Sequence, residues 1–295
     1  MLTVLHCAAR EPTTMPLLQA TLPTVRTITP WRPLVWLVYG WRDMIQVGWI
    51  SFAHGLALTV VGANIVAIAQ SRFWLLAGAL SGFMVIAPVL ATSLYALSHA
   101  LERGETANLS VVTKTWLNWQ NNHFNKWGND YWCMLQFGTL LALAATGWVL
   151  TSAALITLLA PAPILGPMDF VQHVVLAEDG WLFELWLAMG GMMAAPLFAS
   201  SVVSMPLLLD RRVTLMQAVL TSWQTVITNP VPMALWAALI MVFTLLGLGS
   251  LLLGLIVVIP MLGHASWHAY RDLVDASTFP THDSMPTPSN EPGTH

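Results

Sequence analysis

The stretch Gly190 to Pro196 reads G-G-M-M-A-A-P and lies inside a long apolar run. Gly82 to Pro88 reads G-F-M-V-I-A-P, Gly254 to Pro260 reads G-L-I-V-V-I-P, and each stretch pairs a glycine with a proline six residues later. Glycine and proline are common in transmembrane helices, and repeated broken helices are typical of membrane proteins built from duplicated units. The spacing therefore predicts three copies of one membrane-embedded unit.

The composition predicts an all-α, polytopic membrane helical bundle. Of 295 residues, 56% are hydrophobic and 8% are charged, whereas about a quarter of the residues in a soluble domain are charged. Fifteen Trp residues suit the aromatic belts at membrane interfaces. We expect the lipid bilayer as a partner, and the sequence has no basic patch that indicates nucleic acid.

Apolar runs locate the transmembrane helices. Four runs have a suitable length: Trp49 to Ala69, Phe73 to Leu97, Trp132 to Ala160 and Trp181 to Leu209. The remaining run, Met233 to Ala269, would measure on the order of 55 Å as one helix, well beyond the ~30 Å hydrocarbon core. We therefore divide it at Gly247 to Ser250 and predict six transmembrane helices.

The charges predict an orientation. With six spans, nearly all basic residues before Val274 fall on one side of the membrane: Arg26, Arg32, Arg42, Arg103, Lys114, Lys126, Arg211, Arg212 and Arg271. By the positive-inside rule that side is cytoplasmic. We expect a multi-pass protein of the bacterial inner membrane with both termini in the cytoplasm.

An amphipathic segment precedes each predicted hairpin. Apolar residues recur at helical spacing over residues 213–228, and more weakly over 109–119 and 34–45. Such helices lie in the headgroup region, or pack on loops as soluble amphipathic helices. We predict three repeat units of an interfacial helix plus a hairpin, at about 34–105, 109–212 and 213–274, in one domain over 26–274. Residues 1–25 and 275–295 are predicted to be disordered.

Several short segments resemble a known family. They are G-W-R-D at Gly40 to Asp43, L-E-R-G-E at Leu101 to Glu105, P-L-L-L-D-R at Pro206 to Arg211, and G-H-A-S-W-H-A-Y-R at Gly263 to Arg271. Together they resemble an uncharacterised bacterial inner-membrane family, catalogued as a domain of unknown function. Some members are labelled cytochrome c oxidase subunit I, but the adjacent His-His copper pair of that subunit is absent here. The resemblance implies a membrane location and no particular activity.

Histidines form the most specific candidate site. His264 and His268 are four residues apart, so they share a helix face on which two imidazoles can bind one metal ion. His54 and His99 lie toward the same predicted side and could add ligands for copper or haem, with Asp272 as an outer partner of His268. A pair alone leaves a metal site incomplete. Histidines at the membrane interface are the alternative.

A second candidate is a polar cluster. Thr92, Ser200 and His264 each follow a motif proline by four residues, and each proline leaves a carbonyl without its helical hydrogen bond. If the three units surround a pseudo-threefold axis, these three polar groups would meet. In the alternative interpretation, the Ser and Thr hydroxyls bond their own backbone. The kink and packing positions are Gly82, Pro88, Gly190, Pro196, Gly254 and Pro260.

Three functions remain open, and an enzyme is the least favoured class because no catalytic motif is present. The first is an accessory or assembly factor for an inner-membrane complex. The second is a metal- or haem-handling protein that uses the His pair. The third is a small-solute transporter or channel, for which repeated broken helices are typical; no acidic residue at a predicted midplane supports ion coupling.

Overall fold

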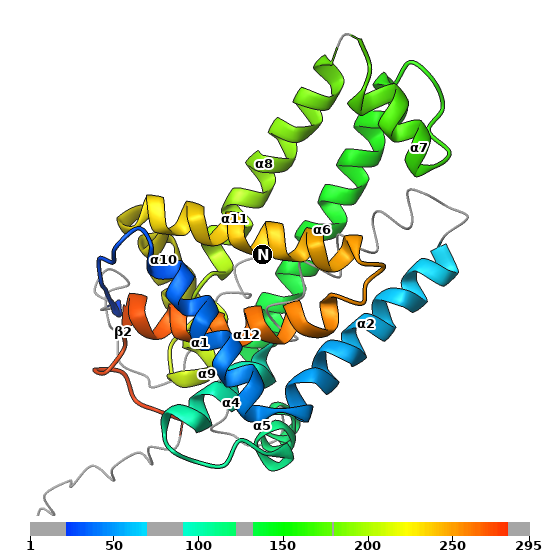
Figure 1. Cartoon of the computed structure of the whole chain (residues 1–295). Coiled ribbons are helices and arrows are strands. Elements are labelled where there is room, and N and C mark those ends of the chain that lie inside the picture. Colours follow the sequence, from blue (N-terminus) through cyan, green and yellow to red (C-terminus); the bar gives the residue numbers. More distant parts are fainter. Residues whose placement is uncertain (1–21, 70–90, 122–131, 179, 283–295) are drawn as a thin grey trace, which may run out of the picture.

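The computed structural model describes residues 22–69, 91–121, 132–178 and 180–282, which are mainly helical (Figure 1). Two short strands lie at the ends of the described fold: β1 (Thr24–Val25) and β2 (Val274–Asp275). The helices between them are α1 (Arg32–Val47), α2 (Trp49–Ala69), α4 (Thr92–Glu102), α5 (Leu109–Asn121), α6 (Trp132–Leu159), α7 (Pro167–Phe170), the π-helix η2 (Val171–Val175), α8 (Trp181–Ser201), α9 (Ser204–Asp210), α10 (Leu215–Thr228), α11 (Pro230–Gly249) and α12 (Leu255–Leu273).

Four helical segments of the described chain are long and apolar enough to cross a membrane. They are Trp49–Ile68, Gln136–Leu159, Trp181–Asp210 and Pro230–Gly249. These segments confirm a helical membrane protein, whereas the predicted number of six spans is not confirmed. Most of the predicted second span, together with Gly82 and Pro88, lies outside the described residues. The predicted sixth span, α12, is not among the four, because His264, His268, Arg271 and Asp272 make its second half polar.

The division of the last apolar run is confirmed. Helix α11 ends at Gly249, and α12 begins at Leu255 after a turn. Two residues of this turn have positive φ, 55° at Leu251 and 71° at Leu252. The Gly254 N–H donates to Ser250 Oγ over 2.7 Å, so the start of α12 is tied to the end of α11.

All three predicted amphipathic segments are helices, namely α1, α5 and α10. Helix α10 begins with a capping box: Thr214 accepts a hydrogen bond from the Gln217 N–H (3.2 Å), and the Gln217 side chain accepts from the Thr214 N–H (2.9 Å). These two bonds satisfy backbone donors that the first turn of a helix leaves free. Each helix also keeps large apolar side chains exposed, such as Trp41 on α1, Trp116 on α5 and Trp223 on α10.

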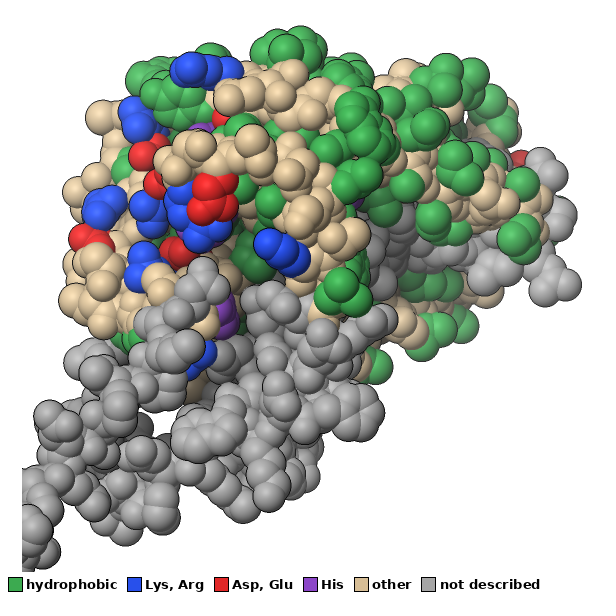
Figure 2. Space-filling model, turned by 90° about the horizontal axis from the view of Figure 1, so that it is seen from below, with side chains coloured by type: hydrophobic (Ala, Val, Ile, Leu, Met, Phe, Trp, Pro, Cys, Tyr) green, Lys and Arg blue, Asp and Glu red, His purple; other side chains and the backbone are tan. Residues whose placement is uncertain are grey.

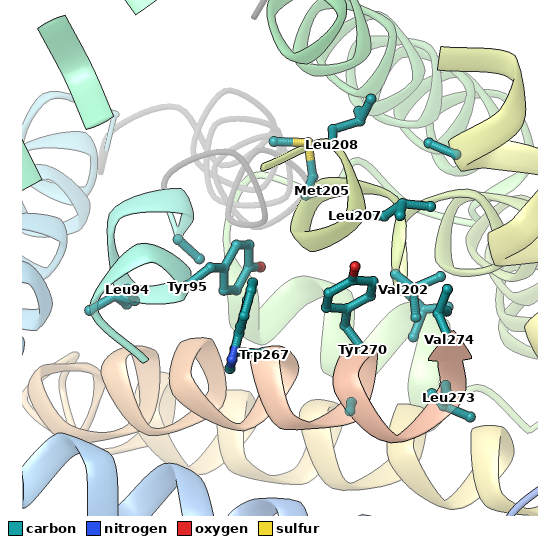
Figure 3. Close-up of a cluster of buried hydrophobic side chains, with 14 of the residues drawn as sticks. Leu94, Tyr95, Val202, Met205, Leu207, Leu208, Trp267, Tyr270, Leu273 and Val274 are labelled. Carbon is teal, nitrogen blue, oxygen red and sulfur yellow. The ribbon is translucent and has the colours of Figure 1, made fainter. Parts of the chain in front are cut away.

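The main core lies where α4, α9 and α12 meet. Figure 3 shows Tyr95 of α4 and Trp267 and Tyr270 of α12 pointing into this cluster, with Leu207 and Leu208 of α9 opposite. All five side chains are buried. In Figure 1, α6 and α8 extend away from the core as one pair, while α2 extends in a different direction. We call this packed part, with α4, α9 and α12 at its centre, the base. The long apolar helices α2, α6 and α8 project from the base.

Both ends of the described chain are attached to this base. Strands β1 and β2 pair antiparallel, and Asn229 fixes the entering segment by accepting from the Ile28 N–H (2.9 Å) and donating to the Arg26 carbonyl (3.0 Å). At the other end, Arg211 and Arg212 donate to main-chain carbonyls of residues 279–282. These contacts reach Thr24 at one end and His282 at the other, and the predicted domain bounds, 26–274, stay a prediction.

Charged side chains gather at the base (Figure 2). Ion pairs there join residues that are distant in sequence: Arg26 with Asp275 (2.9 Å), Arg32 with Asp272 (2.6 Å) and Arg271 with Glu102 (2.8 Å). Figure 2 also shows hydrophobic side chains on the rest of this face. This separation is expected of a protein with one end outside the hydrocarbon layer. Which side of the membrane the base occupies stays a prediction.

Candidate functional site

Helix α12 is the central element of the candidate site. Helices α1 and α2 follow one another along α12, and α4 packs on it from another side. The approach is close at two glycines: a Cβ at Gly40 would overlap Ala265 and the Met261 carbonyl, and a Cβ at Gly55 would overlap the Ile256 main chain. Both positions therefore require a residue without a side chain, and side chains next to these contacts are brought together.

His264 of α12 occupies the centre of this junction. Its ring contacts two serines: Ser51 Oγ of α2 lies 2.9 Å from Nε2, and Ser98 Oγ of α4 lies 2.7 Å from Nδ1. Ser98 in turn donates to Asp43 Oδ2 of α1 over 2.7 Å. The exposed fractions of Ser51, Ser98 and His264 are 0%, 1% and 0%. A polar link therefore connects four helices inside the fold.

Asp43 connects this link to the edge of the base. Asp43 Oδ2 lies 2.8 Å from His268 Nε2, and the His268 side chain is 24% exposed. Burial opposes ionisation of Asp43, but hydrogen bonds from His268 and Ser98 outweigh burial and hold the pKa of the Asp43 carboxyl below its ordinary value. Asp43 is therefore ionised at neutral pH and fixes the direction of the hydrogen bonds around it.

The ionised carboxylate of Asp43 determines the hydrogen positions in all of these linked hydrogen bonds. A carboxylate only accepts hydrogen bonds, so the Ser98 hydroxyl donates its one hydrogen to Asp43 and must accept from Nδ1–H of His264. Neutral His264 then accepts at Nε2 from the Ser51 hydroxyl. His268 donates to Asp43 from Nε2. We refer to Ser51, His264, Ser98, Asp43 and His268 as the relay.

Helix α2 extends the polar surface away from the base. After Ile50, the buried residues of this apolar helix are Ser51, Gly55, Thr59 and Gly62, so its small and polar side faces inward. The Thr59 hydroxyl is buried and has no hydrogen-bond partner among the residues that the structure describes. The Ile256 carbonyl beside Gly55 lacks its usual helical donor, because Pro260 has no N–H. The Thr59 hydroxyl and the Ile256 carbonyl are thus two further polar groups beyond Ser51 along α2.

A second His-Ser contact lies one turn along α2. His54 donates from Nδ1 to the Ile50 carbonyl (2.8 Å), and its Nε2 lies 2.8 Å from Ser93 Oγ of α4. A neutral His54 therefore accepts from Ser93. This contact joins α2 to α4, as the Ser51 to His264 contact joins α2 to α12, and it adds a titratable group beside the relay.

The predicted metal-binding histidines have different partners. His264 contacts serines, His268 contacts Asp43, His54 contacts Ser93, and the His99 ring stacks on Trp267 at 4.7 Å between centroids. Within the ranges that the structure describes, no three His, Cys, Asp or Glu side chains are arranged to hold a metal ion. The predicted metal site stays a prediction.

Asp272, which we expected beside His268, has other partners. It accepts hydrogen bonds from Arg32 Nε (2.6 Å) and Trp36 Nε1 (2.6 Å). Asp43 takes the place we predicted for Asp272. The reason is geometric: α1 runs along α12, so its Asp43 reaches His268, while the end of α12 carries Asp272 to the start of α1.

The three residues of the predicted polar cluster lie on three different helices. Thr92 is buried at the start of α4, which packs on α12. Ser200 accepts from Trp223 Nε1 of α10 over 2.9 Å. The hydrogen bonds of His264 lead to α2 and α4 instead. A meeting of Thr92, Ser200 and His264 on a pseudo-threefold axis stays a prediction.

The described motif positions have separate structural roles. Gly190 faces the Trp148 ring of α6, where a Cβ would lie 2.9 Å from the ring, so this glycine packs against α6. Gly254 lies in the turn before α12. Pro196 and Pro260 are inside α8 and α12.

Sequence reasoning missed three relay residues: Asp43, Ser51 and Ser98. A signal was present for Asp43, because the buried face of α1 is the stripe Pro33, Trp36, Gly40, Asp43, Met44 and Val47. An acid within a buried apolar stripe needs a hydrogen-bond or ionic partner inside the fold. Ser51 and Ser98 gave no comparable signal, since serines are ordinary in membrane helices.

Comparison with known proteins identifies one similar family. Residues 75–210 match the family model described as "Predicted integral membrane protein (DUF2189)". No curated protein and no solved structure matches the chain. The matched residues include α4 and Ser98 but neither α1 nor α12, so the relay lies partly outside the match. The chain is similar, over residues 75–210, to a membrane-protein family of unknown function, which confirms the resemblance inferred from its sequence.

Proposed function

We propose that the protein moves a small polar species between its charged base and the membrane interior. The observation that carries this proposal is the relay, a set of direct side-chain hydrogen bonds that leads from partly exposed His268 to buried Ser51. Polar and ionisable groups within membrane proteins are costly, and they mark substrate and proton pathways. The sequence argument against ion coupling was the lack of an acid at a predicted midplane, and that argument stands, since Asp43 is a buried acid of α1 at the base end of the relay.

The surface beyond Ser51 supports the same proposal. The unpaired Thr59 hydroxyl and the Ile256 carbonyl, which Pro260 deprives of a donor, continue the polar groups along α2. Unsatisfied buried polar groups cost about 1–3 kcal/mol each. A transported species that hydrogen-bonds to them in passing would offset this cost.

Flux through proteoliposomes tests the proposal. The purified protein is reconstituted, and entry of protons and of small neutral solutes is recorded with wild type and Pro260→Ala. Alanine restores an N–H that bonds the Ile256 carbonyl, so we expect lower flux. Pro196→Ala, in α8, is the matched control and should keep wild-type flux. The absence of flux of every species with wild type would overturn the proposal.

A second candidate function is that of an accessory or assembly factor for a membrane complex. The favouring observation is the low self-burial of the projecting helices: only 22% of the apolar window is buried in α6 and in α11. On α8, Ala188, Gly191 and Ala195 are exposed at helical spacing, and small residues allow close helix contacts.

If this function holds, Gly191→Leu dissociates a complex seen by native electrophoresis of membranes, and His264→Ala does not. A complex of unchanged size in Gly191→Leu would contradict it. No contact among the described residues favours the metal- or haem-handling alternative.

For either function, we propose that the base lies on the cytoplasmic side of a bacterial inner membrane. Helices α1, α5 and α10 would then lie in the headgroup region, since each exposes apolar side chains close to the charged base. Each of these helices precedes a long helix, namely α2, α6 or α11, which supports the proposed repeat. A reporter fused after Val274 tests the orientation, and a periplasmic signal would contradict it.

A further inference from the structure

We infer that the species carried along the relay is the proton. This inference rests on the proposed function and names its substrate. Every link of the relay is a direct contact of 2.7–2.9 Å between two side chains. Ser51, Ser98 and His264 are fully or almost fully buried, so a solute would have to separate packed helices, whereas a proton needs only existing hydrogen bonds.

The hydrogen positions allow a balanced transfer in one concerted step. His264 Nε2 takes the Ser51 hydroxyl proton as Ser51 receives one from a hydronium ion on the interior side, which becomes water. His264 Nδ1 gives its proton to Ser98, and Ser98 gives its own proton to Asp43. His264 and both serines end neutral, and the Asp43 carboxylate becomes a carboxylic acid. One proton has then crossed from Ser51 to Asp43 with no redox change.

The transfer ends at the edge of the base. The Asp43 side chain is 11% exposed, so the proton leaves Asp43 to water, because His268 Nε2 already carries the hydrogen that it donates to Asp43. The relay regains its resting order when His264 exchanges its two tautomers. This requirement makes His264 the position that gates conduction, because an imidazole can accept a proton on one nitrogen while it releases one from the other.

The surroundings of His264 favour a neutral ring at rest. The titratable groups that act on it are Asp43 of α1, His54 of α2 and His268 of its own helix, and α4 presents the neutral hydroxyl of Ser98. Asp43 is ionised, and it lies on the side toward which the proton moves.

The test is a comparison of two fluxes in the same proteoliposomes. An internal pH dye reports proton entry after a pH jump, and light scattering reports glycerol entry after an osmotic step. The relay variants are Ser98→Ala and His264→Gln, and the matched control is Ser152→Ala, a buried serine that accepts from Trp186 Nε1 (2.6 Å) between α6 and α8. Circular dichroism and gel filtration of each variant confirm folding.

We expect proton entry with wild type and Ser152→Ala. Positioned proton-transfer groups contribute roughly 10²–10⁴ in rate, so entry should fall at least about a hundredfold in Ser98→Ala. Folded Ser98→Ala with wild-type proton entry would overturn the inference. Glycerol entry without proton entry would overturn the inference and leave the transport proposal standing. Entry of neither species would overturn the transport proposal itself.

Discussion

Removal of Asp43 is the sharpest test of how the base is held together. In Asp43→Ala, Ser98 and His268 lose their shared acceptor. Ser98 is 1% exposed and cannot reach water, and His264 loses the orientation that Ser98 gives its ring. Each buried unsatisfied group costs about 1–3 kcal/mol. His268 can bond to solvent and adds little. We therefore expect a loss of about 2–6 kcal/mol in unfolding free energy, about 1–3 kcal/mol from each of two affected groups.

Unfolding in mixed micelles, followed by tryptophan fluorescence, measures this loss. Asp43→Asn keeps the shape and one acceptor oxygen, so it should lose less than Asp43→Ala. Glu105→Ala is the control, because the Glu105 pair with Arg103 is about half exposed and such pairs contribute about 0–1 kcal/mol. A loss below ~0.5 kcal/mol in Asp43→Ala, typical of surface substitutions, would refute the reasoning.

Three further predictions concern particular contacts. Gly55→Leu should destabilise the fold by at least about 1–3 kcal/mol, since any Cβ overlaps the Ile256 main chain. Gly191→Leu, where nothing lies within 4 Å of a Cβ, should leave the unfolding curve of the isolated protein unchanged. Equal effects of the two substitutions would contradict the close approach of α2 and α12. Thr214→Ala should cost about 1 kcal/mol through loss of the α10 cap, measured by the same unfolding assay, and no loss would contradict the capping box. The pKa of Asp43 is lowered by its hydrogen bonds, so the stability that its carboxylate provides is fully present above about pH 4, the ordinary pKa of an aspartic acid. This stability is lost as the pH falls through the lower pKa of Asp43 in the folded protein. An infrared carboxylate band, assigned with Asp43→Asn, should persist at pH 4, and its disappearance at higher pH would contradict the lowered pKa.

The sequence predicted the helices well because their signals are local. Trp49 to Ala69 and the starts at Trp132 and Trp181 coincide with α2, α6 and α8. Apolar length and aromatic ends depend on neighbouring residues alone. The short helix α9 was not foreseen as a separate element, because the break after Ser201 has no proline or glycine to mark it.

The candidate site was predicted less well because it depends on packing between distant segments. His264 was predicted as a member of a polar cluster or of a metal site, whereas the contacts of its buried ring come from α2 and α4, at sequence separations of 213 and 166 residues. Helical spacing suggested Asp272 for His268, whereas packing of α1 against α12 supplies Asp43. Periodicity shows which residues share a face, and it does not show which helix covers that face.

The central claim is that Asp43 orders the relay, and the tautomer of His264 reports this order directly. We would measure the ¹⁵N chemical shifts of the His264 ring in the reconstituted protein at neutral pH, assigned with His264→Gln. The account predicts a neutral ring protonated at Nδ1. A ring protonated at Nε2 or a charged imidazolium would contradict the account.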